Sequence, residues 1–327
     1  MSTSKVIVIL GATGNQGGSV AEAFLSEPDW RVRAITRNAK SSKAQALSSK
    51  GTQVVQADLD EPSTLVAAFE GANAIFAVSD FWGLYSDLAN KSRAKPGQPL
   101  NQWAAEHEEQ QLKNKWSKGK YTRVYHFDGK ARAAEYIPKA QPDLWAKTSV
   151  FQAGLFLSNF VQLPLNQPIK VSRHFLLQEI RQNNINTQNT EGVAQFISPL
   201  DPDTKFPFIA AEEDSGPIVK ALIIQEPAGH NLIGYREWLT SKEIAESFTK
   251  ATGIESAAVK SDGTFPPGFS EEFVGEMKDC FGYFNEFGYE GRDDPTIVHP
   301  RDLKSAPKLG TAEDYFMKQD WSKVFNS

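Results

Sequence analysis

Three glycines near the start of the chain are spaced for contact with a phosphate. Gly11, Gly14 and Gly17 directly follow the apolar run at residues 5–10. In a turn between a buried strand and a helix, the first glycine permits the turn, the second lets the backbone approach a pyrophosphate, and the third lets the helix pack closely. The helix N-terminus then presents free N–H groups to the phosphates. The spacing favours dinucleotide binding over a merely structural turn.

The second expected strand, residues 31–36, ends in a basic segment. Arg37, Asn38 and Lys40 stand where an NAD-preferring site usually places a carboxylate that accepts from the ribose 2′-hydroxyl. A guanidinium instead matches the extra 2′-phosphate of NADP. The segment therefore favours NADP over NAD, the alternative being that Arg37 is a solvated loop charge.

The elements that must position these residues alternate between strand and helix. Strands are expected at residues 5–10, 31–36, 53–56 and 74–78, with helices at residues 19–25, 42–50 and 63–69 between them. This order predicts the α/β class, with a Rossmann-type, doubly wound parallel sheet.

The pattern departs from that fold after residue 80. A polar loop is expected at residues 81–99 and a charged helix at residues 100–115. A fifth strand should follow, yet only residues 116–120 separate this helix from the segment 121–130. Either the fifth-strand region is deleted, which leaves sheet edges without hydrogen-bond partners, or the sequence comes from an altered or mispredicted transcript.

Later elements are expected at wider spacing. A helix at residues 130–137 should end before Pro138, and Thr240 with Glu243 predicts a capping box for a helix that stops at Gly253. Strands are expected at residues 148–153 and 206–211, a helix at residues 214–222, and an aromatic terminal segment at residues 313–325 that docks on the body.

The chain resembles the NmrA-like family, a branch of the atypical short-chain dehydrogenases. The resemblance rests on residues 11–17, 36–37, 57–58, 126–130, 200–205 and 320–324. It implies an NADP-binding Rossmann domain, expected at residues 1–160, and a smaller α/β C-terminal domain at residues 161–327, some of whose segments return to the Rossmann sheet. Some relatives are redox-sensing transcriptional regulators, and others are oxidoreductases, often of fungal secondary metabolism.

The resemblance also directs attention to one lysine. Typical short-chain dehydrogenases use Tyr-x-x-x-Lys, and Lys130 occupies the lysine position while His126 replaces the tyrosine. Lys130 is expected to hold the nicotinamide ribose. An imidazole transfers protons near neutral pH, so His126 is a candidate proton donor, the alternative being a packed structural histidine. The candidate cofactor-binding residues are Gly11, Ala12, Thr13, Gly14, Asn15, Gln16, Gly17, Arg37, Asn38, Lys40, Asp58, Leu59, Ser79, Asp80, Phe81, Lys130, Gly154, Leu155 and Phe156.

Composition narrows the function classes. The 327 residues carry a net charge of −5, which argues against direct nucleic-acid binding. No apolar run reaches the roughly 18–20 residues of a membrane span, and no secretory signal is expected, so the cytoplasm or nucleus is the expected location. Cys280 is the single cysteine, which excludes a disulfide framework, and it is expected to be a buried thiol. The histidines have no metal-binding spacing.

Two functions remain open at this level. The chain is expected to be an NADP(H)-dependent oxidoreductase acting on a small metabolite, or a catalytically silent NADP sensor read by a protein partner such as a transcription factor. The missing tyrosine and serine of the dehydrogenase pattern favour the sensor. A third alternative is a nonfunctional remnant of such a protein.

Overall fold

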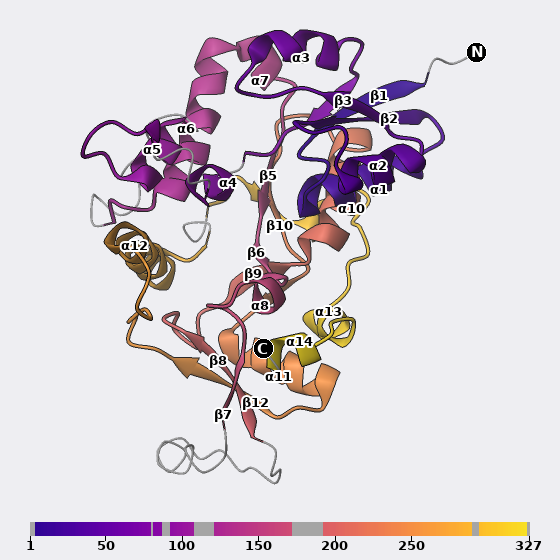
Figure 1. Ribbon diagram of the computed structural model, residues 1–327. Coiled ribbons are helices and arrows are strands. Elements are labelled where there is room, and N and C mark those ends of the chain that lie inside the picture. Colours follow the sequence, from indigo (N-terminus) through magenta and orange to yellow (C-terminus); the bar gives the residue numbers. More distant parts are fainter. Residues whose placement is uncertain are drawn as a thin grey trace.

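The fold is mixed α/β, with a parallel sheet at one end and two small sheets toward the other (Figure 1). The computed structural model describes residues 4–79, 81–86, 92–107, 121–171, 192–289 and 294–325. In the described ranges, no helix has both the length and the apolar character to cross a bilayer.

The first sheet confirms the strands expected in the N-terminal part. Its order is β3-β2-β1-β4, and every pair is parallel. The strands are β1 (Lys5–Leu10), β2 (Trp30–Thr36), β3 (Gln53–Gln56) and β4 (Ala74–Phe76). Ile9 on one face of β1 and Val8 on the other are both fully buried, as expected for a strand covered on both sides.

Helices cover both faces of this sheet. They are α1 (Asn15–Leu25), α2 (Ser42–Ser49) and α3 (Pro62–Phe69). Phe24 of α1 and Leu47 of α2 pack in the cluster around Ile9, whereas Ala68 of α3 packs in the cluster around Val8. This confirms the doubly wound arrangement, although α1 begins four residues earlier than expected.

The described residues between β4 and β5 contain no strand. Strand β5 (Val150–Ala153) pairs with β10 (Asn231–Gly234), which pairs with β13 (Ile297–Val298), while β4 pairs with β1. The parallel sheet is therefore divided where a fifth strand was expected, and residues 108–120 lie outside the described ranges. The elements found in this stretch are α4 (Phe81–Ser86), α5 (Leu100–His107), α6 (Tyr125–Ala140) and α7 (Pro142–Trp145).

Two sequence expectations in this stretch are wrong. Residues 81–99 are not entirely loop, because Phe81 is buried against Ala104 and Ala105 and anchors the short helix α4. Helix α6 also begins at Tyr125 and continues through Pro138. The turn that contains the proline is closed by the N–H of Gln141, which donates to the carbonyl of Ile137 at 2.8 Å. The part of the expected helix 100–115 beyond His107 lies outside the described residues.

The C-terminal half is built on two three-stranded sheets and an aromatic core. One sheet has the order β11-β9-β6 and the other β12-β8-β7. The strands are β6 (Leu155–Phe156), β7 (Ile169–Val171), β8 (Val193–Ser198), β9 (Phe206–Ile209), β11 (Glu237–Leu239) and β12 (Ser256–Lys260). The helices are α8 (Asn159–Gln162), α10 (Ala211–Ile224), α11 (Ser241–Thr252), α12 (Glu271–Phe287), η2 (Pro300–Asp302), α13 (Ala312–Met317) and α14 (Ser322–Phe325).

Local signals in this half are confirmed. Thr240 and Glu243 form the expected capping box at the start of α11, and Gly253 ends that helix with φ +72°. The terminal segment docks as expected, because Tyr315, Phe316 and Trp321 are all buried in the aromatic core.

Helix α10 crosses back to the first sheet and lies against α1 (Figure 1). The N–H of Gly216 donates to Ser19 Oγ at 2.9 Å, and a Cβ at Gly216 would collide with the Ser19 carbonyl. Further along, Lys220 pairs with Glu27 at 2.8 Å. The residue numbers of the two contacts rise together along both segments, so α1 and α10 run in the same direction. Their N-termini therefore lie at the same end.

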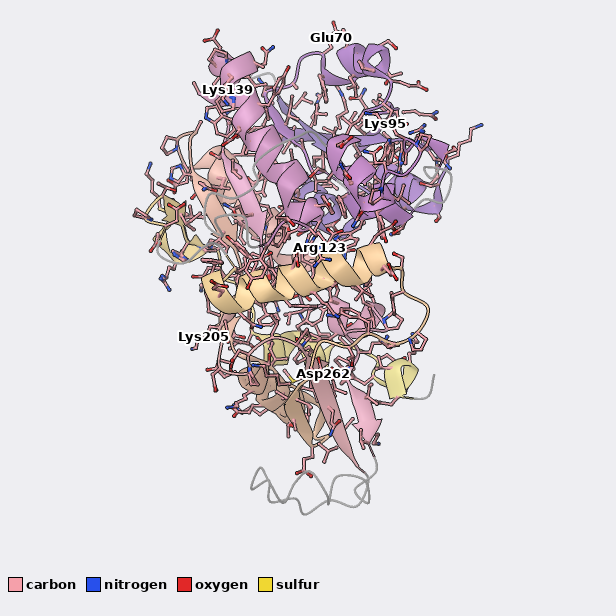
Figure 2. The ribbon with its side chains drawn as sticks, turned by 90° about the vertical axis from the view of Figure 1, so that its left-hand side faces the viewer. Glu70, Lys95, Arg123, Lys139, Lys205 and Asp262 are labelled. Atoms are coloured by element: carbon pink, nitrogen blue, oxygen red, sulfur yellow. The ribbon has the colours of Figure 1, made fainter. Side chains whose placement is uncertain are left out.

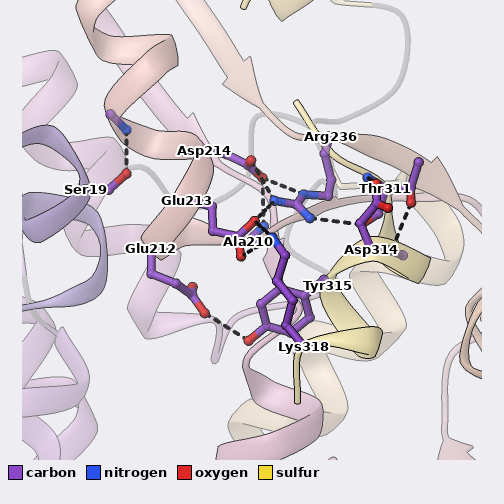
Figure 3. Close-up of polar contacts among 12 residues, drawn as sticks. Ser19, Ala210, Glu212, Glu213, Asp214, Arg236, Thr311, Asp314, Tyr315 and Lys318 are labelled. Carbon is purple, nitrogen blue, oxygen red and sulfur yellow. Dashed lines mark hydrogen bonds and ion pairs between the residues drawn. The ribbon is translucent and has the colours of Figure 1, made fainter. Parts of the chain in front are cut away.

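A buried ionic cluster joins the start of α10 to α13 (Figure 3). The Arg236 side chain is fully buried, donates to both carboxylate oxygens of Asp214 at 2.8 Å, and reaches Glu213 at 2.9 Å. Its third nitrogen donates to the carbonyl of Thr311 at 2.9 Å. Burial alone would raise the pKa of Glu213, but Arg236 and Lys318 more than offset it and hold that pKa below its usual range. This cluster fixes α10 from the C-terminal side.

Candidate functional site

The glycine turn has the geometry that its spacing predicts. Gly11 has φ +69°, and a Cβ there would lie 2.6 Å from a methyl group of Val78. The N–H of Gly14 donates to the carbonyl of Gly11 at 2.9 Å, which closes the turn. At Gly17, a Cβ would collide with the backbone of Gly11 and Ala12. Two of the three glycines are therefore required by the fold itself.

Gly14 is less strictly required by the protein. Its φ of −95° and ψ of 178° suit any residue, although a Cβ would lie 3.3 Å from the Gly11 carbonyl oxygen, a tight contact that would need a small shift of the turn. It is the exposed N-cap of α1, where no side chain caps the helix and no acidic residue lies in the first turn. An exposed helix N-terminus with free N–H groups and a glycine at its N-cap fits a pyrophosphate.

The basic segment lies beside this turn. Strand β2 runs next to β1 with Ile35 opposite Leu10, so Arg37 emerges near the turn at the carboxyl edge of the sheet. Arg37 is exposed and forms no ion pair with a described carboxylate. The Asn38 side chain accepts from the N–H of Lys40 at 3.0 Å and shapes the loop. A free guanidinium at this position fits an anionic group.

The end of β3 offers a different surface. The N–H of Ala57 donates to the carbonyl of Thr36 at 3.1 Å, which holds the ends of β2 and β3 together. Asp58 accepts from the N–H of Asp60 at 3.1 Å and is used in a turn. Leu59 is 58% exposed and provides the apolar surface that an adenine ring would need.

Lys130 lies beyond the end of β4. Ser79 is exposed there, Asp80 lies outside the described residues, and Phe81 is only 1% exposed. The Lys130 ammonium lies 5.9 Å from the centre of the Phe81 ring and donates to the carbonyl of His126 at 3.0 Å. The buried Phe81 ring thus packs beneath the Lys130 ammonium, and the Lys130 side chain is exposed.

His126 is engaged by the protein on both sides of its ring. Nδ1 lies 2.6 Å from a carboxylate oxygen of Glu276, and Nε2 lies 3.8 Å from Sγ of Cys280. A carboxylate accepts hydrogen bonds, so Nδ1 carries the proton that points to Glu276. In a neutral ring, Nε2 is then the remaining nitrogen and can only accept a hydrogen bond, and it faces the thiol. The side chain is 12% exposed and packs α6 on α12, as in the alternative of a packed structural histidine, and its role as a proton donor stays a prediction.

Sequence reasoning missed the group that organises His126. Glu276 is 1% exposed and accepts from the His126 N–H at 3.0 Å and from the Asn101 amide at 2.9 Å. Its signal was present, because Glu276 shares one helix face with Cys280 and Phe284, and a carboxylate on an apolar face needs partners. As expected, Cys280 is buried; burial and the Glu276 charge raise the pKa of its thiol.

Gly154, Leu155 and Phe156, which follow β5, make close contacts with other strands. A Cβ at Gly154 would lie 2.5 Å from the carbonyl oxygen of Pro207 and 3.1 Å from that of Gly234, and its N–H donates to Gly234. Leu155 and Phe156 form β6 and pair with β9. The neighbouring backbones therefore account for the glycine at position 154, and its contact with the cofactor stays a prediction.

The described side chains contain no group of three histidines, cysteines or carboxylates suited to a metal ion. The candidate site is instead a carboxyl edge at which a bare helix N-terminus, a free arginine and an exposed leucine lie together. That arrangement is typical of a dinucleotide-binding Rossmann fold.

The chain belongs to the NmrA-like family, whose sequence profile matches residues 3–92 and 108–316. It is 25% identical to an NmrA-like family domain-containing oxidoreductase of Penicillium ochrochloron, covering 97% of this chain and 98% of that protein. It is 28% identical to another such oxidoreductase, of Aspergillus hancockii, covering 77% of this chain and 74% of that protein.

A solved structure with the same fold is that of NmrA, a negative transcriptional regulator. The TM-score is 0.66 at 18% identity, over 97% of this chain and 95% of that one, for the complexes with NADP and with NAD alike. At this identity the likeness concerns the fold.

Proposed function

We propose that this chain binds NADP(H) and acts as an oxidoreductase on a small-molecule substrate. The observation that carries the proposal is Gly14, an exposed glycine at the uncapped N-terminus of α1, with no acidic residue in the first turn of the helix. The family membership and the two fungal oxidoreductases support the same function. The NmrA structures with bound NADP and NAD support a nicotinamide dinucleotide.

Each part of the edge has a role in this proposal. The glycine turn holds the pyrophosphate, Arg37 with Lys40 holds the 2′-phosphate, and Leu59 lies against the adenine. The exposed Lys130 binds the nicotinamide ribose. The cofactor, when bound, supplies a hydride, and the protein's contribution is to hold and orient it.

A second candidate function is an NADP sensor that a protein partner reads. The observation in its favour is His126, whose two ring nitrogens face Glu276 and Cys280 rather than a substrate. A transcription factor as partner remains a prediction of this second candidate, and the cytoplasm, or the nucleus, remains the predicted location under either function.

Calorimetric titration with NADPH and NADH tests the cofactor assignment. Arg37→Ala should weaken NADPH by about tenfold or more and leave NADH within twofold, because only NADPH carries the phosphate. Arg31→Ala is the matched control, since Arg31 is an exposed arginine near the start of β2, at the end of the strand opposite to Arg37. Equal weakening of both cofactors by Arg37→Ala would show that the arginine does not recognise the phosphate.

Turnover separates the enzyme from the sensor. NADPH oxidation is followed with a panel of aldehydes, ketones and quinones, for the wild type and for Lys130→Met. Turnover that falls in the variant supports the oxidoreductase. Tight NADPH binding with no turnover on any compound supports the sensor.

A further inference from the structure

Aromatic side chains gather where α4 meets the N-terminal end of α12. We call this group the aromatic patch, and its members are Trp82, Tyr85, Phe265, Phe269 and Phe273. Their ring centres are 6.0 Å apart for Trp82–Tyr85, 6.3 Å for Trp82–Phe273, 6.1 Å for Phe265–Phe273, 6.3 Å for Phe265–Phe269 and 5.1 Å for Phe269–Phe273. Two segments almost 190 residues apart in the chain therefore form one continuous aromatic surface.

The patch is held firmly although it is partly open. Trp82 is 40% exposed and Phe269 is 41% exposed, which is unusual for rings already in contact with other rings. Below Trp82 lies the His126 ring, 5.1 Å away, and Glu276 fixes that histidine. Across the junction, the hydroxyl of Tyr85 lies 3.4 Å from that of Ser270. These contacts fix the rings of α4 against α12 before any ligand arrives.

The patch adjoins the proposed nicotinamide end of the site. Phe81 precedes Trp82, and their ring centres are 5.1 Å apart. The Lys130 ammonium lies over Phe81, the other member of this pair, 5.9 Å from the centre of its ring. A molecule resting on Trp82 is thus one aromatic ring away from the lysine to which the ribose is assigned. This inference rests on the proposed function.

The geometry points to a flat aromatic ring of a small-molecule substrate as the occupant of the aromatic patch, with Trp82 and Phe269 as the specificity-determining residues. A protein partner needs about 800 Å² of surface and roughly 20–30 residues on each side. Two exposed ring side chains, each with about 150–250 Å² in total, fall far short of that area. They match the size of one or two fused rings, which would pack on them edge-to-face or offset-stacked.

The test uses two alcohols of similar shape, 2-naphthol and its saturated analogue decahydro-2-naphthol. Each is titrated by calorimetry into the full chain at saturating NADP⁺. We expect 2-naphthol to bind at least about threefold more tightly, because only it has π-faces. Trp82→Leu and Phe269→Leu should each weaken 2-naphthol by about fivefold or more and leave NADP⁺ affinity within twofold. Tyr136→Leu is the control, as this exposed tyrosine lies on α6 outside the aromatic patch.

Three outcomes would overturn the inference. They are equal binding of the two alcohols, unchanged 2-naphthol binding in both leucine variants, and a dimer in sedimentation experiments that Trp82→Leu converts to a monomer. The last would assign the patch to a second copy of the chain. Failure of the proposed function is seen separately, as failure of NADP⁺ to bind the wild type. The 2-naphthol titration is then repeated without NADP⁺ and judged by the same comparisons.

Discussion

The glycine turn and the stretch from β4 to β5 are held together in opposite ways. The turn is fixed by contacts among residues 11–18, where a carbonyl of Gly11 closes the loop and the backbone of Ala12 touches Gly17. The α4–α6 stretch depends on α12, which crosses the molecule below α6 and faces Arg123 (Figure 2). The dinucleotide half of the fold is thus locally complete, whereas the half that carries Lys130 is positioned from another part of the chain.

The same contrast separates residues kept for the fold from residues open to a ligand. Gly14 is exposed and has an ordinary extended backbone, so it is more open to a ligand than Gly11 or Gly17. Gly154 and His126 look functional in the sequence, yet backbone contacts and the Glu276 carboxylate account for them fully. A residue whose type could do chemistry therefore indicates a functional site only where its neighbours leave it open to a ligand.

The largest effect is expected from a substitution that disrupts the glycine turn. Gly17→Ala places a Cβ against the backbone of Gly11 and Ala12, and should lower the free energy of unfolding by about 3 kcal/mol. Gly18→Ala is the matched control. Its Cβ meets only the Ala12 carbonyl at 3.4 Å, so the better helix former should raise stability by about 0.5 kcal/mol. Urea unfolding of both variants measures the difference, and equal effects would contradict the turn geometry.

The second-largest effect is expected from a substitution that weakens the contacts between α12 and the α4–α6 stretch. Glu276→Gln replaces an acceptor of three hydrogen bonds with a group that also presents donors, which should cost about 2 kcal/mol of unfolding free energy. Glu272→Gln, one turn nearer the N-terminus of α12 but with an exposed side chain, should change little. Calorimetric NADPH titration of Glu276→Gln should still show binding, because the glycine turn is fixed independently. Loss of binding would mean that the two regions are coupled.

A third substitution separates stability from binding within the turn. Serine is a preferred N-cap and suits the extended backbone at Gly14, so Gly14→Ser should leave the unfolding free energy within about 0.5 kcal/mol of the wild type. Its side chain stands where a pyrophosphate would approach, so NADPH affinity should fall by about tenfold or more. Thermal unfolding and calorimetry measure the two quantities, and a variant that binds NADPH normally would remove the pyrophosphate from this turn.

The smallest expected effect depends on pH. Burial alone would raise the pKa of Asp279, but the Arg123 guanidinium and the N–H groups of Arg123 and Thr122 outweigh it and hold that pKa below its ordinary value. A carboxyl with a lowered pKa stabilises the fold above its unfolded pKa, near 4, and that contribution disappears as the pH falls through the folded pKa.

Asp279→Asn should therefore lower stability at pH 7 by about 1 kcal/mol, a modest value because Arg123 is half exposed. Urea unfolding at pH 7 and near pH 3 measures the effect. The difference between the variant and the wild type should begin to shrink below about pH 4 and continue to shrink as the pH falls further, and a difference that stayed constant from pH 7 downward would point to packing rather than charge.

Several features could be predicted from the sequence because their causes are local. The strands of the first sheet, the helices that follow them and the capping box at Thr240 all rest on residues within about one element of each other. The helix through Pro138 and the short helix at Phe81 could not, since burial against distant residues decides both. The domain boundary at residue 160 stays a prediction.

The sequence by itself determined the glycine turn, the basic end of β2 and the division of the parallel sheet among the described strands, because chain spacing controls each of them. Only the tertiary structure decided what surrounds His126, whose partners Glu276 and Cys280 lie 150 and 154 residues away. It also assembled the aromatic patch from α4, the segment that precedes α12, and the first turn of α12. Contacts between such distant segments depend on how whole elements pack, and no pattern within one segment specifies that packing.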